Sequence, residues 1–281
     1  MTTVSFALHC QDDSVAASEE WDLVIMVLEI CVDSVESAIA AEAGGAQRVE
    51  LCSDLLEGGI TPSAGLIEIV RGNVNIEIFA MVRPRGGDSF YTSFEFDAMK
   101  RDVIHAKNLG ADGVVFGLLD GSGHVDVART RELVELAHPM QVTFHRAFDM
   151  SADLEDSLER IVEAGAHRIL TSGGRQSVAE GAECVARLIQ RANGRVRIMA
   201  GGSIRQENIE KIASLTGATE FHCSLRTQME SPVKFRNPEV QLGTAANDEF
   251  ARFAVLEEDV RSLRMALDRI ESAAGQRVSG R

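Results

Sequence analysis

The sequence lacks any long run of apolar residues. No stretch approaches the roughly 20 consecutive apolar residues that a bilayer-spanning helix requires. The first residues, MTTVSFALHCQDDSVAASEEWD, contain no basic region of the kind that opens a secretory signal, and they become acidic toward their end. We therefore expect no membrane segment and no membrane partner, and we interpret residues 1–24 as a flexible N-terminal leader.

Basic residues are also scarce. The chain has 28 Lys and Arg residues against 43 Asp and Glu residues, which gives a formal net charge of −15 and a pI near 4.9. Nucleic acids and anionic membranes are bound through basic surfaces, so this balance argues against both as partners. We interpret the excess of acid as a feature that favours solubility.

Cysteine is sparse as well, with five residues in a chain of 281. They are Cys10, Cys31, Cys52, Cys184 and Cys223. A small, odd set in a chain of this length does not indicate a disulfide framework. It is typical of reduced thiols in the cytoplasm, and we therefore predict a cytoplasmic protein.

What the chain does have is a regular alternation of short β-rich runs with amphipathic helical stretches. Eight βα units predict a parallel sheet, whose simplest closure is a single-domain (β/α)8 TIM barrel of the α/β class. A doubly wound open sheet is the alternative, but no G-x-G-x-x-G follows the first strand. The expected strands are Val27–Val32, Arg48–Cys52, Ile78–Arg83, Gly113–Gly117, Gln141–Phe148, Arg168–Thr171, Arg197–Ala200 and Glu220–Ser224.

The remaining segments are assigned around this barrel, which we place at residues 25–281. Residues 225–246 are long and irregular and follow the last strand, so we expect a lid loop over the barrel mouth. A C-terminal helix is expected near Glu249–Ser272. Helix N-caps are expected at Ser34, Thr61, Asp153 and Ser177.

A short motif occurs twice, as LEIC at Leu28–Cys31 and as VELC at Val49–Cys52. Alternate residues of a strand share a face, and the apolar face must meet the helices. Glu29, Cys31, Glu50 and Cys52 therefore point into the barrel, near the carboxyl ends of two neighbouring strands. The two thiols are then metal-ligand candidates, and soft thiolates favour Cu(I). The alternative is that both are small buried apolar residues.

Charged residues of other strands are expected at the same mouth. His145 and His222 lie in the expected fifth and eighth strands, Arg83 ends the third, and Arg85 follows it. In an enzyme, His145 would be the general acid or base, with Glu29 or Glu50 as its partner. Arg83 and Arg85 would bind an anionic substrate. The structural alternative is an ion-pair network in which these two arginines neutralise the two glutamates.

Glycine pairs follow the sixth and seventh strands. Barrels often bind phosphate there through exposed backbone N–H groups. Ser172, Gly201 and Gly202, with the hydroxyl of Ser224 on the eighth strand, are therefore candidate ligand-binding residues for a phosphate or carboxylate group. The alternative is that the glycines only turn the chain.

Several of these segments together resemble the CutC family, the copper homeostasis proteins. The resemblance extends from Val27 to Asn237, and it implies a TIM barrel associated with copper handling in the cytoplasm, often as a homo-oligomer. It also implies that Cys31 and Cys52 bind Cu(I). The segments are LEICVDS, RVELCSDLLEGGITPS, VRPRGGDSFY, TFHRAFDM, RILTSGG, MAGGSI and EFHCSLRTQMESPVKFRN.

Two functions follow as hypotheses. The first is a copper homeostasis protein that binds Cu(I) through Cys31 and Cys52, with the copper ion as its partner and without turnover. The second is an isomerase, lyase or hydrolase acting on a small anionic metabolite, with or without a phosphate group, through His145 and a glutamate.

Overall fold

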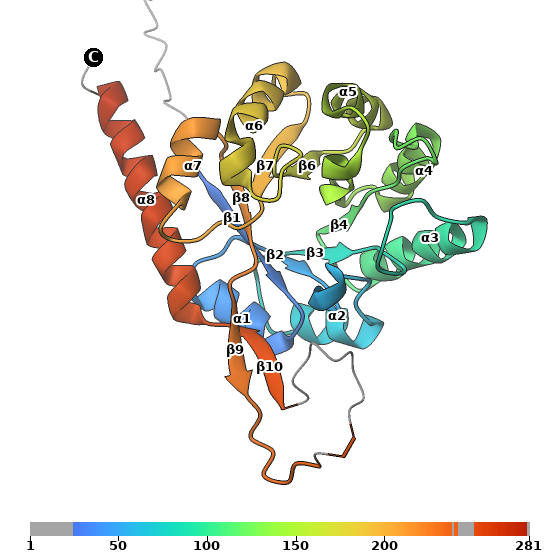
Figure 1. Ribbon diagram of the computed structural model, residues 1–281, viewed down its shortest axis with the longest axis vertical. Coiled ribbons are helices and arrows are strands. Elements are labelled where there is room, and N and C mark those ends of the chain that lie inside the picture. The colour runs from blue at the N-terminus through green and yellow to red at the C-terminus, as the bar shows by residue number, and fades with distance from the viewer. Residues whose placement is uncertain (1–24, 238, 241–249, 280–281) are drawn as a thin grey trace, which may run out of the picture.

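A computed structural model describes residues 25–237, 239–240 and 250–279 of the chain. The predicted leader, residues 1–24, lies outside the described residues. Eight parallel strands close into a barrel in sequence order, with β8 paired to β1 (Figure 1). The strands are β1 Val27–Val32, β2 Arg48–Leu51, β3 Glu77–Met81, β4 Gly113–Phe116, β5 Gln141–Phe144, β6 Arg168–Thr171, β7 Arg197–Gly201 and β8 Glu220–Cys223. The predicted barrel is confirmed.

Helices connect the strands and surround the sheet (Figure 1). They are α1 Val35–Ala43, α2 Ala64–Arg71, α3 Ser93–Asn108, α4 Val127–Ala137, α5 Leu154–Ala164, α6 Val178–Ala192, α7 Ile209–Thr216 and α8 Glu257–Ser279. Ser34, Asp153 and Ser177 cap the helices that follow them, as predicted. The prediction for Thr61 was wrong, because Ser63 accepts the N–H of Leu66 and caps α2. No helix in the described part of the chain is long and apolar enough to cross a membrane.

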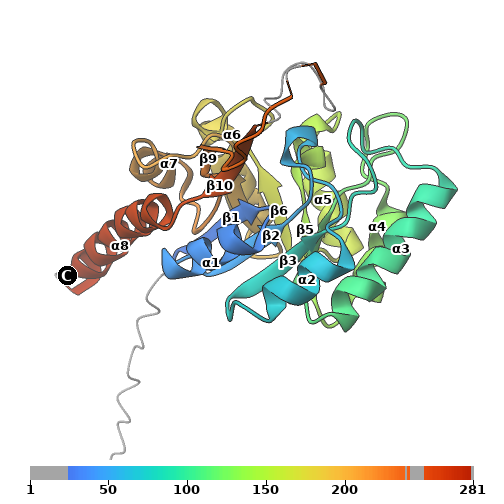
Figure 2. The ribbon, with the colours of Figure 1, turned by 90° about the horizontal axis from the view of Figure 1, so that it is seen from below.

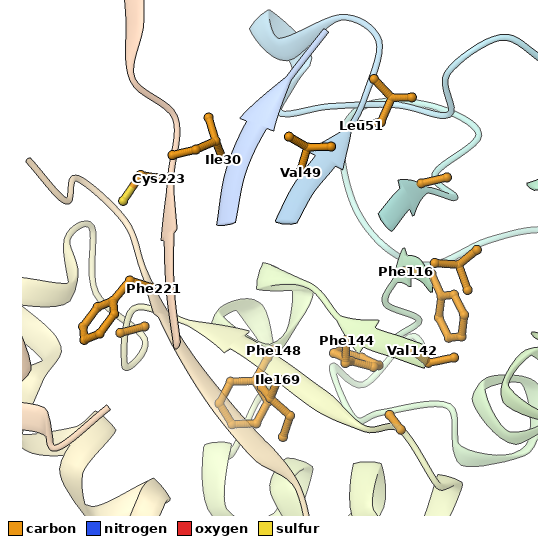
Figure 3. Packing of buried hydrophobic residues seen from close by; sticks show 14 of the residues in the cluster. Ile30, Val49, Leu51, Phe116, Val142, Phe144, Phe148, Ile169, Phe221 and Cys223 are labelled. Carbon is orange, nitrogen blue, oxygen red and sulfur yellow. The ribbon is translucent and has the colours of Figure 1, made fainter. Parts of the chain in front are cut away.

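The main hydrophobic core lies between the strands and the helices. The register pairs Ile30 of β1 with Val49 of β2 and with Cys223 of β8. These three side chains are at most 2% exposed and belong to one cluster, part of which Figure 3 shows. Cys223 therefore faces the helices, as the strand alternation predicted, and is not part of the barrel interior.

The barrel interior contains a second, smaller cluster. It holds Cys31, Cys52, Phe79, Met81 and Val115, all 5% exposed or less. The ring of Phe79 also contacts two arginine side chains, described below. The inward face of this barrel therefore combines apolar packing with thiols and charge.

The predicted boundaries of the fifth strand and of the C-terminal helix were wrong. The fifth strand ends at Phe144, and a 3-10 helix, η2 Arg146–Met150, follows it instead of a continued strand. The C-terminal helix begins at Glu257 and not near Glu249, because Ala251–Val255 form a strand, β10.

The segment that was expected to be a lid begins as a strand. β9, Arg226–Glu230, pairs antiparallel with β10, and this hairpin lies beside α1 (Figures 1 and 2). The N–H of Val255 donates to Oγ of Ser37 on α1 at 3.1 Å. Residues 238 and 241–246 of the expected lid lie outside the described residues.

Candidate functional site

Three potential metal ligands meet at the carboxyl ends of adjacent strands. Cys31 on β1, Glu50 on β2 and His222 on β8 each offer one ligand atom, and these atoms all lie within 4.8 Å of one another. The register explains the meeting, because it pairs Cys31 with Glu50 and Glu29 with His222. The prediction that inward residues of the first two strands and the last strand converge is confirmed.

The second thiol lies directly behind the first. The sulfur atoms of Cys31 and Cys52 are 3.9 Å apart, and Sγ of Cys52 is 3.6 Å from Oε2 of Glu50. Two sulfur ligands of one ion, each about 2.3 Å from it, are at most about 4.6 Å apart, so this spacing fits a shared ion. Cys31 faces a cavity, whereas Cys52 is fully buried and packs against Gly59. A Cβ atom added to Gly59 would lie 2.9 Å from Sγ of Cys52.

The surroundings of both thiols favour their neutral form. The hydrogen bond with Cys52, burial and the charge of Glu50 raise the pKa of Cys31 well above its usual value. The hydrogen bond from Cys31 lowers the pKa of Cys52, but burial and Glu50 outweigh it and raise that pKa to about 12. A bound cation would supply the positive charge that thiolates in this environment need.

His222 is oriented by a buried carboxylate. Its Nδ1 lies 2.6 Å from Oε1 of Glu29, and its Nε2 lies 3.9 Å from Oε2 of Glu50. Burial alone would lower the pKa of His222, but Glu50, Cys31 and Glu29 together raise it well above its usual value. Glu29 thus fixes which ring nitrogen faces Glu50 and the cavity, the usual role of a carboxylate behind a metal-binding histidine.

Glu50 combines burial with an unsatisfied oxygen. Its side chain is 3% exposed, and Oε1 has no hydrogen-bond partner among the described residues. Burial raises the pKa of Glu50, and the nearby His222 opposes that shift. A buried acceptor without a partner is costly, and an ion bound beside Cys31 and His222 would satisfy it. The donor set of sulfur, imidazole nitrogen and carboxylate oxygen therefore fits a metal ion.

The ion pairs inside the barrel are not those that were proposed from the sequence. Glu29 pairs with Arg48 of β2 and not with Arg83 or Arg85. Burial alone would raise the pKa of Glu29, but Arg48 and the hydrogen bond from His222 outweigh it and lower that pKa to about 2.

The same layer of the barrel includes a second arginine and a second glutamate. Nη2 of Arg48 lies 2.7 Å from Oε2 of Glu220, and Arg168 of β6 also pairs with Glu220. The guanidinium carbons of Arg48 and Arg168 lie 4.8 and 5.2 Å from the ring centre of Phe79. Sequence reasoning missed both arginines, although Arg48 lies two residues before Glu50 and so shares its face.

Arg83 and Arg85 have different surroundings from each other. Arg83 lines the cavity and donates to the carbonyl oxygens of Glu57 and Gly59 at 2.8 and 2.9 Å, which ties two loops together. Arg85 pairs with Glu95 at 2.7 Å and does not line the cavity. The two arginines therefore do not form one clamp.

His145 lies in the cavity wall and is 7% exposed. Its Nδ1 accepts the N–H of Ala147 at 3.1 Å, at the start of η2. Burial, followed by the charge of Arg83, lowers the pKa of His145 to about 3. A ring with so low a pKa is neutral at pH 7 and a weak proton acceptor, which does not favour the predicted role as a general base.

Only one of the four predicted anion-binding residues Ser172, Gly201, Gly202 and Ser224 lines the cavity. Ser224 lines the cavity, whereas Ser172, Gly201 and Gly202 do not. Instead the hydroxyl of Ser172 donates to Asp149 at 3.0 Å, and Asp149 also accepts the N–H of Ser172 at 3.0 Å. Asp149, the last residue of TFHRAFD, was expected near the barrel mouth, and its carboxylate binds the start of the loop after β6.

The cavity itself has a volume of about 370 Å³ and opens at the barrel mouth. It combines an apolar wall with charged groups and with the three metal-ligand candidates Cys31, Glu50 and His222. Arg226, the first residue of β9, is the one member of the expected lid that lines it among the described residues. The lining residues are Cys31, Glu50, Leu55, Gly58, Met81, Arg83, Gly87, Ser89, His145, Arg146, Ala147, Met150, Leu170, His222, Ser224 and Arg226.

Comparisons with known proteins support one family for the chain. The family model described as the CutC family matches residues 26–227. A CutC family protein of Chromobacterium violaceum is 50% identical over 243 residues, which cover 86% of this chain and 98% of that protein. The copper homeostasis protein cutC homolog of Mus musculus is 49% identical over 226 residues, which cover 80% of this chain and 83% of that protein.

A solved structure is similar to the chain as well. A crystal structure of a CutC protein from Streptococcus agalactiae superposes with a TM-score of 0.67 at 31% identity, and the match covers 70% of this chain and 98% of that one. A thiamine phosphate pyrophosphorylase from Pyrococcus furiosus superposes with a TM-score of 0.54 at 13% identity, covering 88% of this chain and 97% of that one. The second likeness concerns the barrel fold alone.

Proposed function

This chain belongs to the CutC family, and from that premise we propose that it binds Cu(I) at the barrel mouth as a copper homeostasis protein. It would buffer the ion or pass it on, without turnover. The relatives from Mus musculus and Homo sapiens carry the name copper homeostasis protein cutC homolog, at 49% identity each. Their name supports copper as the cargo.

The observation that carries the proposal is the meeting of Cys31, Glu50 and His222 within 4.8 Å, with Cys52 3.9 Å from Cys31. Sulfur and imidazole are ligands that Cu(I) accepts, and sulfur is the softest donor in a protein. Cys31 and His222 face the cavity and would be reached first by an ion from solvent. Cys52 would complete the site from behind.

The charge of the site also favours a cation. Glu29 and Glu50 bring two carboxylates, of which Glu29 is already paired with Arg48. An ion would replace the proton on Nε2 of His222 and the proton of at least one thiol, since metal ligands must be deprotonated. Cu(I) binding is therefore expected to release protons.

The enzyme hypothesis has weaker support. Its proposed anion ligands Arg85, Ser172, Gly201 and Gly202 lie away from the cavity, and its proposed base, His145, has a pKa of about 3. It stays a prediction, as do the cytoplasmic location and the homo-oligomeric state. The cytoplasmic proposal is supported by the free thiols of all four described cysteines.

An anaerobic competition titration of Cu(I) against a colorimetric chelator tests the proposal. The variants are Cys31→Ser and Cys52→Ser, and Cys184→Ser on α6 is the matched control. We expect stoichiometric binding by the wild type and by the control, and loss of competition in Cys31→Ser. Binding that is weak in the wild type, or equal in all four proteins, would mean that the thiols only pack in the wall.

A further inference from the structure

Three residues that line the cavity each carry a polar atom without a hydrogen-bond partner among the described residues. Among the described residues, Oε1 of Glu50, Nε2 of His145 and Nε of Arg226 are buried and have no hydrogen-bond partner. All three side chains line the same cavity of about 370 Å³. Buried polar groups are nearly always paired, so several orphans in one cavity indicate a ligand. The proposed copper site accounts for Glu50, which leaves two nitrogen atoms unexplained.

Both remaining atoms are hydrogen-bond donors. Nδ1 of His145 accepts the N–H of Ala147 at 3.1 Å, so the neutral ring carries its proton on Nε2. The ring also packs closely against the backbone of Gly117. A Cβ atom at that position would lie only 2.6 Å from Nδ1 of His145. The guanidinium of Arg226 is also fixed, with its carbon 4.4 Å from the ring centre of Phe253. The cavity therefore presents preorganised donors.

The arginines of the cavity carry excess positive charge. In the described part of the chain, neither Arg83 nor Arg226 forms a direct ion pair with a carboxylate. The charge of Arg226 does act on Asp33, where it opposes the rise in pKa that burial causes. Arg83 donates to backbone carbonyl oxygens, and Nη1 of Arg226 lies 3.4 Å from the carbonyl oxygen of Leu55. Arg146 differs, because its Nε lies 2.8 Å from Oδ2 of Asp149. Two guanidinium groups without a carboxylate in direct contact favour an anionic ligand.

From these observations we propose that the cavity binds a small organic carboxylate, whose oxygens accept from Nε2–H of His145 and from Arg226. The apolar wall of Leu55, Met81 and Leu170 would contact its carbon skeleton. A phosphate group fits less well, because the glycine pairs Gly173-Gly174 and Gly201-Gly202 do not line the cavity. This site goes beyond copper binding and does not depend on it.

Calorimetric titrations of the full chain test this proposal in a chloride buffer free of organic anions. The probes are acetate, lactate, malonate and inorganic phosphate. The cavity variants are His145→Phe, which removes the N–H donor, and Arg226→Met, which removes the charge. The exposed residues His105 and Arg236 give the matched controls His105→Gln and Arg236→Met.

We expect saturable binding of at least one carboxylate, weakened about tenfold or more in both cavity variants and unchanged in both controls. The Nε2 resonance of His145 should shift in nitrogen-15 spectra of the wild type during the same titration. Binding of no carboxylate, binding of phosphate alone, or wild-type affinity in both cavity variants would overturn the proposal. The chelator competition on the wild type measures copper binding in a separate experiment, so a failure of carboxylate binding is distinguished from a failure of copper binding.

Discussion

Nδ1 of His222 lies 2.6 Å from Oε1 of Glu29, a carboxylate with no exposed surface. The other oxygen of Glu29 pairs with Arg48, so the glutamate connects the layer of ion pairs to the layer that holds the thiols. Because the hydrogen bond fixes Nδ1, Nε2 of His222 faces Glu50 at 3.9 Å. The buried ion pairs thereby determine the orientation of a candidate metal ligand.

Removing the charge of Glu29 should destabilise the fold strongly. Glu29→Gln keeps the shape of the side chain but removes the buried carboxylate that pairs with both Arg48 and His222, and breaking a buried pair costs about 3–5 kcal/mol. Glu77→Gln is the matched control, because Glu77 also pairs with Arg48, at 3.5 Å, but is 45% exposed and should cost about 1 kcal/mol or less. Urea denaturation measures both values. Equal losses in the two variants would show that burial of Glu29 does not determine its contribution.

Of the same two variants, Glu29→Gln should bind Cu(I) more weakly than Glu77→Gln. Without Glu29 the imidazole of His222 loses its fixed orientation, and loss of such a supporting group typically lowers metal affinity 10–100-fold. Glu77 does not contact His222, so Glu77→Gln should bind Cu(I) like the wild type. The measurement is the chelator competition described above. Wild-type affinity in Glu29→Gln would exclude His222 as an important ligand.

The sequence was sufficient for the barrel and for the convergence of its inward residues. Strand periodicity placed Glu29, Cys31, Glu50 and His222 inside the barrel, and the closed topology of a (β/α)8 fold then brings the first and last strands together. Periodicity did not give the partners of the glutamates. The residues after β3 form a turn through Pro84, so the direction of Arg83 and Arg85 depends on loop geometry that no repeat encodes.

Two other errors also concern contacts that strand periodicity does not encode. The residues of β10 were expected to be helical. The strand depends on pairing with β9, which joins Ala251 to Glu230 across the intervening chain and leaves no local signal in the sequence. His145 was expected to be a proton-transfer group. In the structure its Nδ1 accepts the N–H of Ala147, a contact that depends on the η2 turn. That turn was read as a continuation of the strand.

The burial of His145 predicts a pH dependence of stability. Its pKa is about 3 in the folded protein and about 6.5 in an unfolded chain. The unfolded state therefore binds the proton more tightly. The contribution to stability is complete above pH 6.5 and decreases as the pH falls from 6.5 toward 3, by at most about 1.4 kcal/mol per pH unit.

Urea denaturation at pH 7, 6 and 5 tests this, with His145→Gln as the comparison. Carboxylates that titrate in the same range are common to both proteins, so the difference between the two profiles reports His145. We expect the free energy of unfolding to fall more steeply in the wild type. Parallel profiles would show that the ring is accessible to protons in the folded state.

The glycines after β6 give a prediction that bears on the anion loop expected from the sequence. Gly173 and Gly194 have nearly the same backbone angle, with φ of +73° and +74°. A Cβ on Gly173 would lie 2.5 Å from the carbonyl oxygen of Gly181, whereas nothing lies within 4 Å of a Cβ on Gly194. Gly194→Ala should therefore cost about 1–2 kcal/mol for the left-handed conformation alone.

Gly173→Ala should cost about 1–3 kcal/mol more, because the added methyl group must displace the backbone of α6. Urea denaturation of both variants measures this difference at matched backbone strain. A larger loss in Gly173→Ala means that this glycine is present for close packing of β6 against α6, and it would account for the absence of Ser172 and Gly173 from the cavity wall. Equal losses would mean that the connection yields easily, and the loop would then be free to approach a bound anion as the sequence predicted.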